Sequence, residues 1–121
     1  MIYRGALLLL GLFTFSAITF AGAGLSSVEK QKIKFLKSAI RTSGCQFERN
    51  GSIHTLSEAL KHIEKKQNYY EDEIDSVEKF IELAASKSSF SGRPYHVICP
   101  NTGKVKSQVW LKQQLINFKI R

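Results

Sequence analysis

The stretch CQFERNGSIH, residues 45–54, decides the fold because it combines a strand pattern, a turn signal and the entrance to a helix. Alternation of side chains places Phe47 and Arg49 on one face of the expected strand. The pair Asn50-Gly51 follows and is a strong turn signal. We expect the strand to end at this turn.

A helix is expected soon after the turn, so the stretch does not predict a two-residue hairpin. Thr55 and Glu58 have the three-residue spacing of a capping box. From there an amphipathic helix is predicted to run to about Asn68, with Lys65 and Lys66 largely outside its buried stripe. No second strand is expected between the turn and this helix.

Cys45 and Cys99 are the two cysteines of the chain, and we expect them to form one disulfide. Closing a loop of this length stabilises a domain by about 4 kcal/mol, against a total stability of about 5–15 kcal/mol. A metal pair or a reactive thiol is the alternative, but neither cysteine has a CxxC partner or a neighbouring cluster of histidines and cysteines. We therefore expect no metal site and no cofactor.

The remaining elements follow from hydrophobic periodicity and turn residues. Further helices are expected at residues 25–43, from 75 or 76 to about 85–87, and after Ser107, which is expected to cap the last helix. Further strands are expected at residues 95–99 and 104–106. The fold class is α+β, a small antiparallel sheet of two or three strands packed with about four helices.

The first 23 residues have the pattern of a cleavable signal peptide. Arg4 is followed by an apolar or small run over residues 5–20, and Ala21-Gly22-Ala23 fits the small-x-small rule for signal peptidase. An uncleaved membrane anchor is the alternative, but the run is 16 residues long and a spanning helix needs roughly 20. We expect an exported chain with no membrane span after cleavage, whose residues 24–121 form a single small domain.

The chain is basic, with a formal net charge of +8, and about +7 remains after Arg4 is removed. The charge is uneven, because residues 71–82 hold six acids and residues 83–121 hold seven bases and no acid. A basic surface attracts anionic partners, here an anionic envelope component or an acidic protein. The plainer interpretation is a solvated face of scattered lysines. Nucleic acid is not expected outside the cytoplasm.

Three motifs carry a family resemblance: FERNG at residues 47–51 followed by His54, EKFIE at 78–82, and above all ASKSSFSGRPY at 85–95. With them the chain resembles the YfeK-like family, a domain of unknown function found in small uncharacterised bacterial periplasmic proteins. Residues 78 and 79 are Glu-Lys where the family pattern would have two acids, and this departure affects surface charge alone. The resemblance implies a periplasmic location and a shared fold, and it implies no activity.

The candidate site lies where two loops meet. If the strands that carry the cysteines pair antiparallel, residues 49–54 and 86–95 come to the same end of the sheet. Cations and hydrogen-bond donors would then surround a helix N-terminus, which suits an anion or a carboxylate. The candidate ligand-binding residues are Arg49, Asn50, His54, Lys87, Arg93 and Tyr95. The plainer interpretation gives each of them a local structural or solvated role.

The sequence therefore leaves two functional hypotheses. The first is a non-enzymatic binding or interaction module with a basic rim for an anionic ligand or an acidic partner. The second is a small hydrolase or transferase that uses His54 and the serines of residues 86–91. Because the sequence has no nucleophile-elbow pattern and no SxxK spacing, we favour the first and assign no catalytic residue.

Overall fold

The computed structural model of the protein describes residues 11–14 and 24–120. The signal peptide expected over residues 1–23 lies outside these ranges except for residues 11–14, and it stays a prediction. No helix in the described part of the chain is long and apolar enough to cross a membrane.

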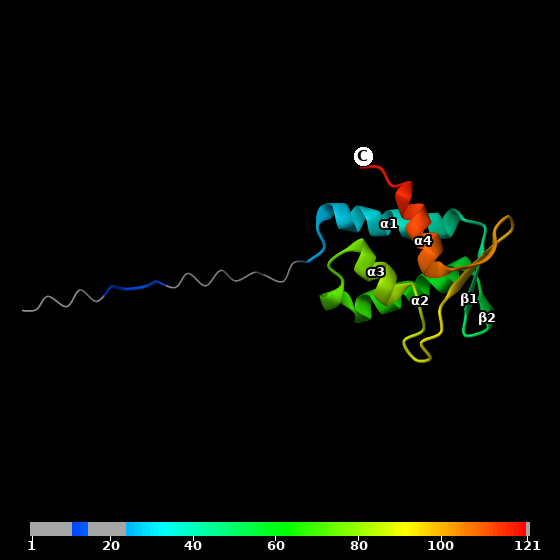
Figure 1. Cartoon of the computed structure of the whole chain (residues 1–121), viewed down its shortest axis with the longest axis horizontal. Coiled ribbons are helices and arrows are strands. Elements are labelled where there is room, and N and C mark those ends of the chain that lie inside the picture. The colour runs from blue at the N-terminus through cyan, green and yellow to red at the C-terminus, as the bar shows by residue number, and fades with distance from the viewer. Residues whose placement is uncertain (1–10, 15–23, 121) are drawn as a thin grey trace, which may run out of the picture.

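The described residues fold into an α+β domain, as predicted. In chain order the elements are α1 (Ser27–Thr42), β1 (Gln46–Arg49), β2 (Ser52–His54), α2 (Leu56–Tyr69), a short 3-10 turn (Glu71–Glu73), α3 (Val77–Ala84), β3 (His96–Cys99), β4 (Gly103–Lys106) and α4 (Ser107–Ile116). The strands form one antiparallel sheet in the order β2-β1-β3-β4. Figure 1 shows the helices gathered on one side of the molecule and the β1–β2 hairpin on the other.

The sheet has four strands, so the prediction of two or three was wrong. The missed strand is β2, which pairs antiparallel with β1 and places Phe47 opposite His54. Asn50 and Gly51 both have positive φ, 51° and 82°, as the two central residues of a tight hairpin turn require. The strand was missed because it is only three residues long and runs directly into the cap of α2.

Antiparallel pairing of β1 with β3 confirms the expected arrangement of the cysteine strands. The register places Phe47 opposite Val97. The Cys45–Cys99 disulfide joins the two chain segments where their Cα atoms are 4.3 Å apart. Because the two strands run in opposite directions, the loop that follows β1 and the loop that precedes β3 lie at the same end of the sheet.

The core lies between the helices and the inner face of the sheet. Leu36, Phe80 and Leu111 come from three different helices and are fully buried. Phe47 from β1 meets Trp110 of α4 edge to face, with 6.4 Å between the ring centroids. The hairpin is therefore anchored through one side of β1, next to the start of α2.

Three of the helices begin at side-chain caps, among them the Thr55 cap that the sequence predicts. Ser26, Thr55 and Ser76 accept hydrogen bonds from the backbone amides three residues later. Ser107 does not cap α4, because the cap position falls on Lys106 and Ser107 is the first helical residue. The Ser107 side chain is buried instead.

Candidate functional site

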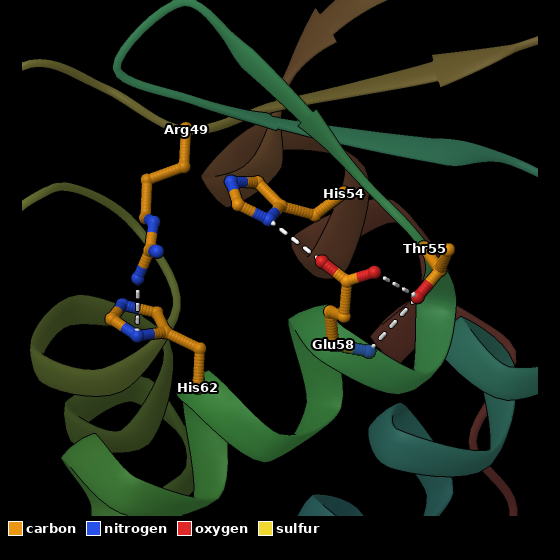
Figure 2. Close-up of polar contacts among 5 residues, drawn as sticks. All are labelled: Arg49, His54, Thr55, Glu58 and His62. Atoms are coloured by element: carbon orange, nitrogen blue, oxygen red, sulfur yellow. Dashed lines mark hydrogen bonds and ion pairs between the residues drawn. The ribbon is translucent and has the colours of Figure 1, made fainter.

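A chain of polar contacts crosses from the hairpin to α2 and on to β3. The Arg49 guanidinium lies 2.5 Å from Nδ1 of His62, and Figure 2 shows it reaching from the hairpin to the ring on α2. The other ring nitrogen, Nε2, lies 2.9 Å from the Tyr95 hydroxyl. The Lys66 ammonium donates to the same hydroxyl at 3.3 Å.

Hydrogen-bond chemistry fixes the protons in this chain of contacts. A guanidinium can only donate, so Nδ1 of His62 accepts and Nε2 carries the proton that goes to Tyr95. The Tyr95 oxygen then accepts from both His62 and Lys66. Its own O–H proton has no acceptor among the described residues, so it is free to bond a ligand.

The electrostatics agree with this assignment of protons. Burial, and then the neighbouring charges of Arg49 and Lys66, lower the pKa of His62 to about 4, so the ring is neutral at pH 7. Burial also raises the pKa of Tyr95, which keeps the phenol protonated.

Lys66 is the least expected member of the site, because the sequence placed it outside the buried stripe of α2. Its side chain is 8 % exposed. The ammonium donates to the Lys87 carbonyl at 2.6 Å and lies 5.1 Å from the centre of the Tyr95 ring. Burial, followed by the charges of Arg49 and Lys87, lowers its pKa. The prediction was wrong because the loop of residues 86–95 folds over this side of the helix.

A cleft of about 800 Å³ opens beside these contacts, and we call it the cationic cleft. Its lining includes three cations and four tyrosine or phenylalanine residues: Arg49, Lys65, Lys66, Tyr69, Tyr70, Phe90 and Tyr95. None of the described residues that line it is acidic. Nor does any carboxylate in the described part of the chain form an ion pair with Arg49 or Lys66.

The structure brings together four of the six predicted site residues. Arg49, Asn50, His54 and Tyr95 all line the cationic cleft. Lys87 and Arg93 do not: both residues are exposed and neither lines the cleft, and Lys87 contributes its backbone carbonyl to Lys66.

Asn50 has a structural task in addition to its place in the turn. Its Nδ2 donates to the Ser88 hydroxyl at 3.3 Å, and its Oδ1 accepts from the Ser91 hydroxyl at 2.6 Å. Ser88 is buried and also accepts from the Ser91 amide. Asn50 therefore ties the hairpin turn to the loop of residues 86–95, which we call the serine loop and which forms one wall of the cleft.

His54 is held locally at the start of α2. Its Nδ1 lies 3.2 Å from the Glu58 carboxylate, which also accepts from the Thr55 hydroxyl at 3.1 Å (Figure 2). These hydrogen bonds lower the pKa of Glu58. Among the described residues no hydrogen bond joins His54 to a serine of the loop. The serine hydroxyls hold structural bonds, as Ser86 does to the Ile81 carbonyl, so the described contacts do not support the hydrolase hypothesis.

His62 and Lys66 are the functional candidates that the sequence did not reveal. Together with Glu58 they recur every fourth residue along one face of α2. That spacing was a usable signal, since side chains four apart in a helix lie above one another. The spacing could not show which other part of the chain packs against that face of α2.

The fold and the site together define a small α+β protein, closed by one disulfide, with a cationic cleft between a hairpin, a helix and a loop. Residues 27–119 match the model of a family of unknown function, DUF5329, and the chain belongs to that family. It is also similar to the uncharacterized protein YfeK of Salmonella typhimurium, with 34% identity over 76 residues. That match covers 62% of this chain and 63% of the relative. No solved structure matches the chain.

Proposed function

We propose that this protein is an exported, non-enzymatic binding module whose cationic cleft takes an anionic ligand. The observation that carries the proposal is the buried Lys66 ammonium beside Arg49, with no carboxylate paired to either among the described residues. A buried cation that lacks a counter-ion costs free energy, and a bound anion removes that cost.

The donors of the cleft suit a carboxylate or a phosphate group. Arg49 keeps N–H groups beyond the one given to His62, Lys66 is an ammonium, and Tyr95 has a free O–H. Charge-assisted hydrogen bonds from such donors are stronger than neutral ones. The neutral His62 ring holds Arg49 in place without adding another positive charge.

Export to the periplasm is part of the proposal and has its own support. The apolar pattern of residues 1–23 is that of a signal peptide. The Cys45–Cys99 disulfide is typical of proteins from oxidising compartments. In that setting the anion would be a carboxylate- or phosphate-bearing component of the envelope, or an acidic protein.

The test is the shift in thermal stability caused by inorganic phosphate, at constant ionic strength set with sodium chloride. Phosphate at ten times its Kd should stabilise the wild-type protein by about 1.4 kcal/mol. The stabilisation should disappear in Lys66→Met and in Arg49→Gln. Lys112→Met is the matched control, because it removes one exposed charge on α4 outside the cleft. Equal stabilisation of all four proteins would overturn the proposal.

A further inference from the structure

A second, smaller cavity lies beside the cationic cleft. Its volume is about 280 Å³. Arg49, His54, His62 and Tyr95 line both spaces, so these four side chains form the boundary between them. The cavity therefore shares four lining residues with the site that the proposed function uses.

The part of the cavity that lies away from this boundary is largely apolar. Phe47 from β1 and Ala59 and Ile63 from α2 line it, and all three are buried. Liquid water occupies about 30 Å³ per molecule, so the volume corresponds to roughly nine non-hydrogen atoms. The cavity fits a short aliphatic chain rather than a bare ion.

Ser107 adds a polar group to this apolar space. Ser107 is 1 % exposed and is one of the residues that line the cavity, and its buried hydroxyl has no hydrogen-bond partner among the described residues. The Ser107 amide donates to the Tyr95 carbonyl, which continues the row of paired residues across the sheet. The same register, continued by one residue, places Arg49 and Ser107 on either side of Tyr95. The backbones of Arg49 and Ser107 are then roughly two strand spacings apart, about 10 Å.

Two carboxylates also line the cavity, and both are already held by cations or donors. Glu48 accepts from Lys104 at 2.7 Å, and Glu58 accepts from His54 and Thr55. Arg49, on the boundary, has no such partner. Lys61 also lines the cavity without an ion pair among the described residues, but it is exposed, whereas Arg49 is half-buried. We therefore place an incoming carboxylate on Arg49.

We propose that the cavity and the cleft together bind a short-chain carboxylic acid of about six carbons with a hydroxyl group at its far end. The carboxylate lies on Arg49 and the Tyr95 hydroxyl, the chain packs along Ala59 and Ile63, and the terminal hydroxyl bonds Ser107. This inference rests on the proposed function, because it uses the same cations, and it adds the class of ligand.

The test compares acetate, hexanoate and 6-hydroxyhexanoate by titration followed with amide NMR shifts. Acetate reports on the cleft alone, and hexanoate adds the aliphatic chain. We expect hexanoate to bind the wild-type protein at least tenfold more tightly than acetate. The hydroxy acid should bind at least threefold more tightly than hexanoate, with shifts at Ala59 and Ser107.

Two variants separate the parts of the ligand. Ala59→Leu fills the cavity, so hexanoate should fall to the affinity of acetate. Ser107→Ala should remove the advantage of the hydroxy acid and leave hexanoate unchanged. Should acetate bind while hexanoate binds no more tightly, the cavity inference fails and the anion site stands. Should no acid bind, this inference fails, and the separate phosphate test decides whether the proposed anion site stands. Retention of the hexanoate preference in a folded Ala59→Leu protein would also overturn the inference.

Discussion

The Arg49 guanidinium donates to Nδ1 of His62, and this contact joins the β1–β2 hairpin to α2. It forces the proton of the neutral ring onto Nε2, and the Nε2–H group donates a hydrogen bond to the Tyr95 hydroxyl on the far side. The ring is thus a fixed spacer between a cation and a phenol. Its neutrality is a condition of the whole arrangement, because a protonated ring would have no acceptor for Arg49.

Folding stability should therefore fall as the pH drops through the range in which His62 would normally titrate. The pKa of His62 is about 4 in the folded protein, against 6.5 for an ordinary histidine. The unfolded chain binds more protons between these values, so stability is highest above pH 6.5 and is lost as the pH falls toward 4. The loss is roughly 2 kcal/mol after allowance for solvent screening of a partly exposed ring. Urea denaturation at pH 7, 5.5 and 4 measures it.

His62→Gln is the control for this pH dependence. Glutamine offers an acceptor for Arg49 and a donor for Tyr95, but it does not titrate. Other groups, including Glu48 and Glu58, titrate in both proteins and cancel in the comparison. If the two proteins lose stability in parallel between pH 6.5 and 4, His62 does not carry the effect.

The parts of the fold with local signals could be predicted from the sequence. The Thr55 cap of α2 and the Asn50-Gly51 turn depend on a few adjacent residues. The Cys45–Cys99 bridge could be predicted because the chain has two cysteines. Predicting these features requires no knowledge of the tertiary packing.

The site depended on tertiary contacts that sequence patterns do not encode. Lys66 has the position of a solvated lysine on an amphipathic helix, and it is buried because the serine loop covers it. Strand β2 is stabilised by its pairing with β1, although three residues give no periodic signal of their own. The predicted Lys87 and Arg93 belong to the same loop, but both are exposed and neither lines the cleft, while the Lys87 carbonyl accepts from Lys66.

Loss of the disulfide should destabilise the protein by about 4 kcal/mol. The bridge closes a sequence separation of 54 residues, and loop-closure entropy for that length gives this figure. The double variant Cys45→Ser, Cys99→Ser tests it by urea denaturation against the oxidised wild type. Reduced wild type is the control, since it has the native sequence without the bond. A loss below about 1 kcal/mol in both would contradict the prediction.

The hydrogen bonds of Asn50 should couple the hairpin turn to the serine loop. Asn50→Gly keeps a residue that tolerates positive φ, so it removes the side-chain bonds and leaves the turn. Ser91→Ala removes the hydroxyl partner. In a double-mutant cycle the coupling free energy should be about 1 kcal/mol. Strictly additive losses of stability would show that the turn and the loop are independent.

The buried Ser107 hydroxyl should contribute nothing to the stability of the free protein. It has no partner among the described residues, so Ser107→Ala removes an unsatisfied group and should leave stability unchanged or raise it by up to about 1 kcal/mol. Ser88→Ala is the matched comparison, since Ser88 is also buried but accepts from Asn50 and from the Ser91 amide. That variant should lose about 1–2 kcal/mol. Denaturation curves that show an equal loss in both would mean that Ser107 is satisfied without a ligand, and they would remove it from the ligand contacts of the cavity.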